Sequence, residues 1–382
     1  MKKKILFNKP NFENEELTNI KKTKFFNQFS GSGNSHFTKK CSDWLKSNIG
    51  CKEALIVNSC TSALEMCAIL LDIKKGDEII LPSYTFVSTA NAFVLRGAKP
   101  IFVDIEQNSF NIDPNKIEAA VSKKTKAIVV VHYAGISCDM RSIKRIAKKN
   151  KLVLIEDAAQ AILAKYKKNY LGSIGDFSTF SFHDTKNIHC GEGGAILINN
   201  KKYIERAKII RDKGTNRDLF NKKIVSKYSW VDIGSSYVLS EINAAILYTQ
   251  FKKSKSITRS KVELWNTYHN LFINLENEKK IKRPIVPNYA KINGHLYWIE
   301  VKKKYRDKLI NYLKKKNIIA PFHYVPLHNS PYYKKKFKNK IKLHFTENKS
   351  KSLIRMPLFN ELKKKEIYFI VSNIEKFFKD KN

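Results

Sequence analysis

The sequence has few cysteines and no long apolar run. Its six cysteines among 382 residues form no C-x-x-C pair, which excludes a disulfide scaffold and a structural zinc module. No apolar stretch approaches the roughly 18 residues of a membrane-spanning helix, and the amino terminus turns polar too early for a signal peptide. With 43% hydrophobic and 12% aromatic residues, the chain can bury a large core. We therefore expect a soluble cytoplasmic globular protein without a membrane segment.

Acidic residues are also scarce: 34 Asp and Glu stand against 72 Lys and Arg, which gives a net charge of +38. A charge of this size is found in nucleic-acid-binding proteins. However, the lysine runs, such as 2–4, 314–316 and 363–365, are scattered and contain no aromatic residues for base stacking. We interpret them as solvated lysine faces and expect no nucleic-acid partner. A positive field would attract a diphosphate-bearing ligand.

Short apolar runs alternate with helical patterns between residues 53 and 155, which predicts an α/β fold with a mostly parallel sheet. The expected strands cover 54–58, 78–82, 101–105, 127–133 and 152–157, and the helices between them cover 61–71, 85–95, 114–121 and 140–149. Two shorter strands are expected at 177–182 and 194–199, a long helix at 240–275, and further strands at 296–301 and 320–325. The pattern predicts a large domain over residues 1–250 and a smaller α+β domain over residues 251–382. Neither a P-loop nor a dinucleotide-binding glycine motif is present.

Three segments that follow predicted strands carry groups suited to chemistry, because ligands of parallel sheets bind at the carboxyl ends of the strands. The first segment, 58–65, places hydroxyl residues at the start of a helix. A helix start of this kind can bind a phosphate, although ordinary helix capping explains these residues equally well. The second ends in Asp157, a buried carboxylate that needs a cation, for which a salt bridge is the simpler interpretation. The third contains Lys186 before a glycine-rich turn. This lysine could form a Schiff base, or it could be one more solvated lysine.

Together the three segments supply what pyridoxal 5′-phosphate requires: an amine, a carboxylate at the pyridinium nitrogen and a phosphate cup. Lys186, Asp157 and the helix start at Thr61 and Ser62 would provide these groups. Phe86 could stack on the ring of the cofactor. Gln160 could form a hydrogen bond with its phenolic oxygen.

Several motifs resemble one known family over nearly the whole chain. They are SCTSALE, LPSYTFVSTANAFVLRGAKPIFVD, VHYAG, IEDAAQ, SFHDTKN…GEGGA, GTNRDLF, DIGSSYVLSEINAAI and HYVPLH. They resemble the sugar-nucleotide aminotransferases of the DegT/DnrJ/EryC1 family, and most of all the dTDP-4-amino-4,6-dideoxygalactose transaminases. The resemblance implies an aspartate-aminotransferase-like fold (fold type I) and a homodimer with shared active sites. It also implies transfer of an amino group from L-glutamate to the 4-keto carbon of dTDP-4-keto-6-deoxy-D-glucose, in the biosynthesis of a surface polysaccharide such as lipopolysaccharide.

The same resemblance implies roles for individual residues. Lys186 would form the Schiff base and carry the proton, Asp157 would pair with the ring nitrogen, and Ser181 would bind the phosphate. In many members an Asn in a G-x-N-Y segment reaches the phosphate of the partner subunit's cofactor; here Ser236 stands at that position, and its side chain is shorter. The expected substrate contacts are His323, His328, Asn34 and Arg217. His132 either lies near the cofactor or is a core histidine at a strand end. We expect no metal site, because the spacing of His323 and His328 does not place both on one helix face and no cysteine or acid accompanies them.

The sequence leaves three alternative functions open. The enzyme could act on another sugar nucleotide, UDP-linked or with a 3-keto group. It could be a related sugar 3-dehydratase, which the presence of Lys186 rather than a histidine disfavours. It could also be a non-catalytic basic nucleic-acid binder, for which the net charge is the only support.

Overall fold

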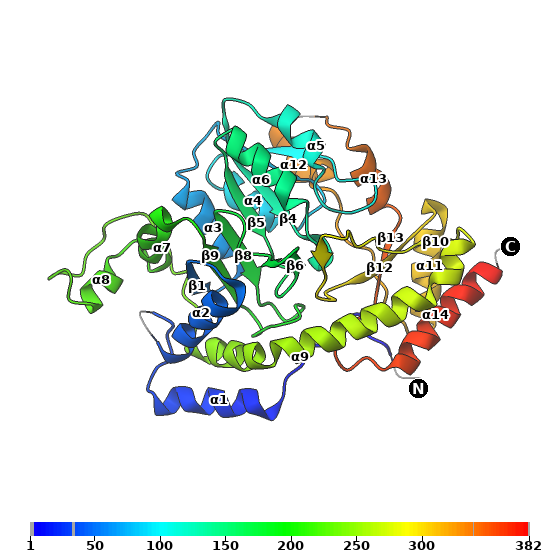
Figure 1. Ribbon diagram of the computed structural model, residues 1–382, viewed down its shortest axis with the longest axis horizontal. Helices are drawn as coiled ribbons and strands as arrows, with labels where there is room; N and C mark the ends of the chain where they lie inside the picture. Colours follow the sequence, from blue (N-terminus) through cyan, green and yellow to red (C-terminus); the bar gives the residue numbers. More distant parts are fainter. Residues whose placement is uncertain (1–3, 33–34, 339, 381–382) are drawn as a thin grey trace.

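A seven-stranded sheet forms the centre of the protein, as the computed structural model shows for residues 4–32, 35–338 and 340–380 (Figure 1). In spatial order its strands are β1 (Glu53–Val57), β9 (Gly194–Ile198), β8 (Phe177–Ser181), β5 (Val153–Asp157), β4 (Thr125–Val131), β2 (Glu78–Pro82) and β3 (Lys99–Val103). β9 runs antiparallel to β1 and β8, and every other neighbouring pair is parallel. The predicted mostly parallel α/β sheet is confirmed. One edge of the sheet therefore collects the carboxyl ends of six strands.

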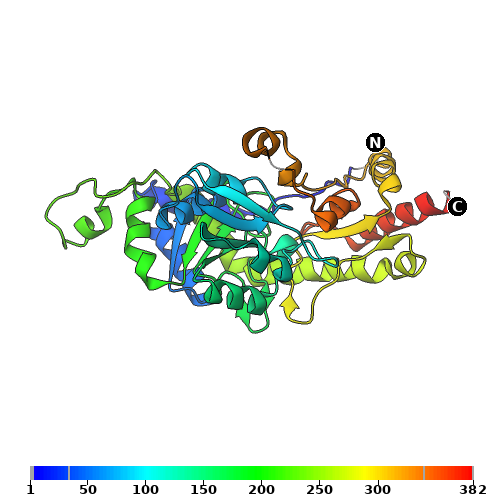
Figure 2. The same cartoon turned by 90° about the horizontal axis from the view of Figure 1, so that it is seen from above.

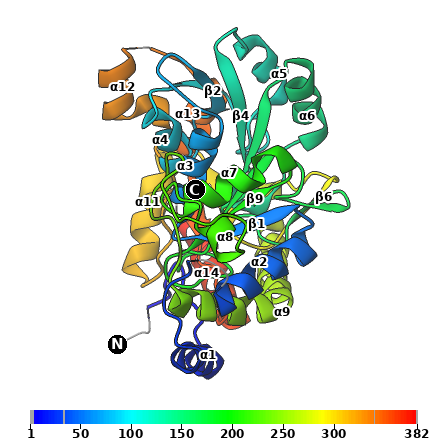
Figure 3. The ribbon, with the colours of Figure 1, turned by 90° about the vertical axis from the view of Figure 1, so that its left-hand side faces the viewer.

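Helices cover both faces of this sheet, which explains why its strands are apolar without alternation. One face packs against α2 (His36–Ile49), α5 (Pro114–Ile117), α6 (Met140–Lys149) and the first half of α9 (Glu241–Leu271). The other face packs against α3 (Cys60–Leu70), α4 (Ser88–Val94) and α7 (Ile204–Arg211). Figure 3 shows α2 and α9 on one side of the sheet and α3 and α4 on the other. Successive side chains such as Leu55 and Ile56 belong to the two different cores.

The second half of α9 belongs to a separate core in the carboxy-terminal part. There Leu264 and Trp265 pack with the antiparallel sheet β10 (Ile281–Lys282), β12 (Tyr297–Val301) and β13 (Leu353–Met356). The helices of this part are α10 (Ile273–Asn277), α11 (Lys303–Lys315) and α14 (Lys364–Lys379). Near the amino terminus, Ile5 joins the same core and bridges to Ile318. α9 thus links the two cores, as Figures 1 and 2 show, and the domain boundary expected at residue 250 falls inside it.

The remaining elements are short or peripheral. They are α1 (Asn14–Phe25), which packs on α9, α8 (Arg217–Asn221), α12 (Pro331–Phe337), α13 (His344–Ser350), the small sheet β11 (Ala290–Lys291), β6 (Lys165–Tyr166) and β7 (Asn169–Tyr170), and the 3₁₀ turns at Glu118–Ala120, Tyr133–Gly135, Lys201–Tyr203 and Leu327–Asn329. Figure 2 shows the segment around α8 projecting from the end of the molecule opposite α14.

Two sequence predictions need correction. Residues 320–325 form no strand; Pro321 and Pro326 each lack the N–H that a ladder requires, and the segment runs along the sheet edge as a loop. β12 pairs instead with β10 and β13, neither of which the sequence revealed. In addition, α4 begins at Ser88 rather than at residue 85, so that Thr85 and Phe86 precede the helix.

Candidate functional site

A cavity of about 480 Å³ lies at the edge of the sheet where the parallel strands end. Its lining comes from the segments after β1, β2, β5 and β8 and from the carboxy-terminal part, and it includes the predicted residues Thr61, Phe86, Asp157, Gln160, Ser181, Lys186 and His323. The strands converge here because β1, β2, β5 and β8 all run in the same direction. The cavity thus brings together residues that lie far apart in the sequence, such as Thr61 and Arg355.

Asp157 is the last residue of β5, and its buried carboxylate accepts two hydrogen bonds. Thr89 on α4 donates from Oγ1 to Oδ2 at 2.7 Å, and the N–H of Ala159 donates to Oδ1 at 3.2 Å. Burial raises the pKa of Asp157, while these hydrogen bonds and the charge of Lys186 act in the opposite direction. A carboxylate held this way is suited to pair with a protonated ring nitrogen.

Lys186 lies in the turn that follows β8, where its backbone N–H donates to the carbonyl of His183. Withdrawal from water lowers the pKa of its ammonium group, and the positive charge of Arg355 acts in the same direction. Cys60 and Asp157 oppose this effect. A lysine with a lowered pKa supplies more of the unprotonated amine that attacks a carbonyl carbon.

The amino terminus of α3 faces the cavity with hydroxyl groups. Ser59 caps the helix by accepting from the N–H of Ser62 at 3.1 Å, and Thr61 and Ser88 share a hydrogen bond of 2.8 Å. Ser62 itself is bound to Ser59 and Asn58 and does not line the cavity. The first turn of an 11-residue helix, with Ser59, Thr61 and Ser88 around it, is a suitable place for a phosphate.

Gln160, Tyr324 and Phe86 form one wall of the cavity. The side-chain oxygen of Gln160 accepts from the N–H of Ala134 at 2.6 Å, so its amide nitrogen donates to the hydroxyl of Tyr324 at 3.1 Å. Phe86 is 55% exposed and lies 6.3 Å from the ring of Tyr324. Such an accessible aromatic face can stack on a planar ligand.

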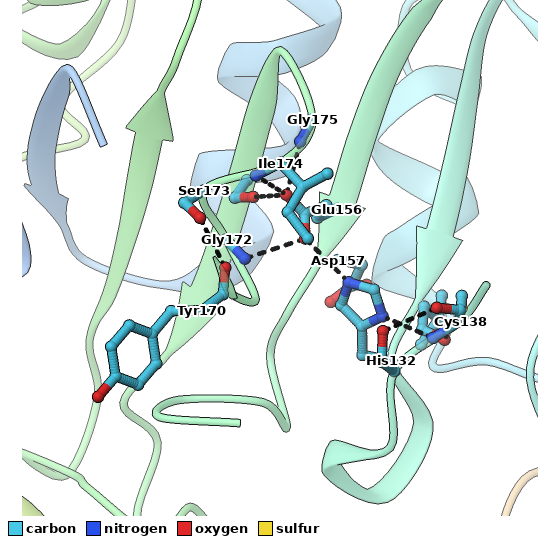
Figure 4. Close-up of polar contacts among 12 residues, drawn as sticks. His132, Cys138, Glu156, Asp157, Tyr170, Gly172, Ser173, Ile174 and Gly175 are labelled. Carbon is cyan, nitrogen blue, oxygen red and sulfur yellow. Dashed lines mark hydrogen bonds and ion pairs between the residues drawn. The ribbon is translucent and has the colours of Figure 1, made fainter. Parts of the chain in front are cut away.

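His132 is a core histidine that binds Glu156 (Figure 4). Its Nδ1 accepts from the N–H of Cys138 at 3.2 Å, so the proton lies on Nε2, which donates to Glu156 Oε2 at 3.0 Å. Glu156 also accepts from the N–H groups of Gly172, Ile174 and Gly175. Both side chains are fully buried and neither lines the cavity. The pair fixes the strand end from which Asp157 emerges.

The structure places several predicted residues away from the cavity. His328 is buried between Ser83 and Glu347, at 2.7 and 3.2 Å. Arg217 contacts Asp212 and Tyr228 in the projecting segment. Ser236 is exposed and pairs with Asp212 as an isolated bridge. Asn34 lies outside the described residues.

Of the residues that the carboxy-terminal part contributes to the cavity, the sequence analysis predicted His323 but missed His295, Tyr324 and Arg355. Tyr324 lies inside the quoted HYVPLH motif, and an arginine within the apolar run LIRMPLF is costly to bury without a partner. Either observation could have identified these two residues as site candidates from the sequence. Thr89 also lies within a quoted motif. Its contact with Asp157 depends on which side of α4 faces the sheet, and the motif does not show this.

The donor set fits pyridoxal phosphate. Lys186 provides an amine, Asp157 a carboxylate, the start of α3 an anion site, and Phe86 an aromatic surface, all on one cavity. In the described residues, no three His, Cys, Asp or Glu side chains are gathered so that they could hold a metal ion. No helix among those residues has the length and apolar character needed to span a membrane.

Comparisons with known proteins point to one family. The profile of the DegT/DnrJ/EryC1/StrS aminotransferase family matches residues 8–375. The spore coat polysaccharide biosynthesis protein SpsC of Bacillus subtilis is 36% identical over 298 residues, which are 76% of this chain and 76% of that protein.

Solved structures extend the likeness over the whole chain. PseC of Helicobacter pylori, an aminotransferase involved in the biosynthesis of pseudoaminic acid, superimposes with a TM-score of 0.91 at 27% identity, covering 99% of this chain and 100% of its own. The candidate sugar aminotransferase Spr1654 of Streptococcus pneumoniae, in its PMP form, superimposes with a TM-score of 0.89 at 25% identity, covering 97% and 98%.

Proposed function

Because this chain belongs to the DegT/DnrJ/EryC1/StrS aminotransferase family, whose cofactor is pyridoxal phosphate, we propose that it transfers an amino group from L-glutamate to a nucleotide-linked keto sugar. The proposed substrate is dTDP-4-keto-6-deoxy-D-glucose and the product dTDP-4-amino-4,6-dideoxy-D-galactose. The motif resemblance supports this choice, and the excess of positive charge suits a diphosphate-bearing substrate. Such a product would serve a surface polysaccharide.

One observation carries the proposal: a lysine of lowered pKa and a buried carboxylate line the same cavity as a helix amino terminus. In the proposed arrangement Lys186 holds the cofactor through Nζ, Asp157 binds its ring nitrogen and the start of α3 binds its phosphate. Phe86 stacks on the ring, and Gln160 and Ser181 bind its polar substituents. When bound, the cofactor supplies an electron sink for the carbon that loses or gains a proton.

The chain's own residues then move the proton. Nζ of Lys186, once it is free, takes a proton from the α-carbon of glutamate. It later delivers a proton to the sugar carbon that receives the nitrogen. Its lowered pKa favours both roles, because general acid–base catalysis is most effective when the pKa approaches the working pH. Asp157, which accepts a hydrogen bond from Thr89, would hold the ring nitrogen of the cofactor during both transfers.

A lysine at position 186 also separates this function from the related dehydration, in which histidine replaces the lysine. For a nucleic-acid-binding role, the net charge of +38 is the only support.

We further propose that the protein acts as a homodimer. Several large apolar side chains on the projecting segment are exposed, among them Trp230 at 81% and Ile224 at 66%. Ser236 follows this segment in the sequence and does not line the cavity of its own subunit. Such a placement suits a residue that reaches the cofactor phosphate of the partner subunit.

A substrate panel tests the function. Keto sugars with the keto group at position 3 or 4, on dTDP and UDP, are incubated with holoenzyme and glutamate, and the products are analysed by NMR. A 4-amino-4,6-dideoxygalactose on dTDP is expected. A 3-amino sugar alone would contradict the substrate, and release of 2-oxoglutarate with no sugar accepted would contradict the sugar-nucleotide class.

A further inference from the structure

Arg355 places a positive charge in the cavity from the carboxy-terminal part of the chain. It lies on β13, and its guanidinium donates from Nε and Nη2 to the carbonyl oxygen of Phe322, at 3.2 and 2.9 Å. The ring of Phe7 covers the guanidinium at 4.4 Å from its centroid. A carbonyl at one edge and a ring on one face fix the orientation of this side chain.

The charge of Arg355 has no acidic partner in the part of the chain that the structure describes: none of the ion pairs there, defined within 4.0 Å, includes it. Burial lowers its pKa, and the groups that act against this are the phenols Tyr133, Tyr324 and Tyr84. Arg355 is half-buried, and a guanidinium that is partly withdrawn from water without a counter-ion is costly. The cost is offset when an anion occupies the cavity beside it.

One edge of the guanidinium remains available. Arginine carries five N–H donors, and the carbonyl of Phe322 uses Nε–H and one N–H of Nη2. The two N–H groups that remain on the Nη1–Nη2 edge are spaced to bind the two oxygens of a carboxylate. Such a bidentate contact also fixes the direction from which the anion enters.

The position of Arg355 favours a small carboxylate near Lys186. Its charge contributes to the lowered pKa values of Lys186, His323 and His295, all of which line the same cavity. The helix start at α3, on the sheet, already provides for a phosphate. In an amino acid, a carboxylate is bonded directly to the carbon from which Lys186 must take the proton.

We propose that Arg355 binds a carboxylate of the amino-acid donor and thereby determines the donor specificity of the enzyme. The proposal rests on the proposed function, because it assumes that glutamate reacts in this cavity. Arg355 orients the donor through its carboxylate, while the sugar substrate enters the same cavity later and carries no carboxylate.

The test compares Arg355→Met and Arg355→Lys with a matched control, Arg306→Met. Arg306 lies 5.5 Å from the ring of Phe322 and binds the carbonyl of Ser350, but it does not line the cavity. The reaction of holoenzyme with glutamate and the reaction of the PMP form with the keto sugar are followed separately by absorbance. Binding of glutarate, a dicarboxylate that cannot react, is measured by calorimetry, and the thermal unfolding of each variant checks its fold.

Arg355→Met should weaken glutarate binding and raise the KM for glutamate by roughly 10–100-fold, since a hydrogen-bonded charge pair is lost. Arg355→Lys should fall between this variant and wild type, and Arg306→Met should match wild type. The kcat/KM for the keto sugar should change less than threefold. Glutamine and isoglutamine, the two monoamides of glutamate, add a second readout: wild type should discriminate against one of them, and Arg355→Met should not.

Two outcomes would overturn the proposal. If Arg355→Met raises the KM for the sugar nucleotide and leaves glutamate unchanged, the arginine binds the diphosphate instead. If glutarate and glutamate bind the folded variant as they bind wild type, it binds no donor carboxylate. Failure of the proposed function would show differently: wild-type holoenzyme would not react with glutamate at all, and glutarate binding would then decide the role of Arg355 alone.

Discussion

Thr89 donates a hydrogen bond of 2.7 Å to Asp157, from the second residue of α4 to the last residue of β5. Thr85 shares a further hydrogen bond of 2.7 Å with Thr89, so a chain of hydroxyl groups leads to the carboxylate. Burial alone favours the neutral acid at Asp157, and this chain opposes that effect. Through this hydrogen bond, the packing of α4 on the sheet affects the pKa of the carboxylate that lines the cavity.

Replacing Thr89 with Val should raise the pKa of Asp157 further and weaken the binding of pyridoxal phosphate by roughly 5–30-fold, because a buried carboxylate loses a donor. Equilibrium dialysis of the cofactor at several pH values measures this effect. The control is Thr258→Val on α9, whose hydroxyl is buried without a hydrogen-bond partner in the described structure. Equal cofactor affinity in the two variants would contradict the role of Thr89.

Glu156→Gln should destabilise the fold by about 3–5 kcal/mol, since the new amide group meets N–H donors that the carboxylate had satisfied. Although burial acts to raise the pKa of Glu156, the hydrogen bonds from His132 and the backbone lower it overall. The carboxylate therefore contributes stability above its ordinary pKa of 4.5, and this contribution is lost as the pH falls below that value.

Urea unfolding of the apoprotein at pH 7 and pH 4 tests this prediction. The difference between wild type and Glu156→Gln should shrink at the lower pH, whereas the exposed control Glu278→Gln should be neutral at both. A difference that stays constant with pH would show that the carboxylate charge is not what stabilises the loop at residues 172–175.

Lys261 is a buried ammonium group on α9 whose Nζ donates to the carbonyl of Leu358 at 2.8 Å. Burial lowers its pKa from 10.5 to about 7. The folded state thus binds fewer protons than the unfolded state between these values, so wild-type stability gains from rising pH in that range. Lys261→Met removes this gain and should be more stable than wild type near pH 7, with the advantage shrinking towards pH 10.

Thermal unfolding between pH 6 and 10 measures that dependence, with Lys255→Met, an exposed lysine on the same helix, as the control. A difference between wild type and Lys261→Met that does not change with pH would contradict the lowered pKa.

Trp230→Asp should convert the proposed dimer into monomers, because it puts a charge on a large exposed aromatic side chain of the projecting segment. Sedimentation velocity measures the change. Tyr368→Asp on α14, which is also exposed, should leave the dimer intact. If wild type is monomeric, or if both variants dissociate alike, the segment around Trp230 is not the proposed interface.

The sequence predicted the central sheet well, because its strands are continuous apolar runs and their order along the chain fixes a common carboxyl edge. Asp157, Gln160 and Lys186 could be singled out from the sequence because each lies at or shortly after the end of a predicted strand. Their roles remain predictions.

The rest depended on contacts between distant segments. The prediction of a strand at 320–325 was wrong because Pro321 within the segment and Pro326 directly after it each lack the N–H that a ladder requires. β13 is four residues long and is interrupted by Arg355, so its pattern is too short to read. The pairing of His132 with Glu156 is set by the register of β4 and β5, and the periodicity of either strand does not reveal it.

Reduction of the holoenzyme with borohydride, followed by peptide mass spectrometry, tests whether Lys186 holds the cofactor. We predict that the cofactor is fixed on the peptide that contains Lys186, and that Lys186→Ala loses both this adduct and the absorbance at the edge of the visible range. Attachment of the cofactor to another lysine, or an unchanged spectrum in the variant, would contradict it.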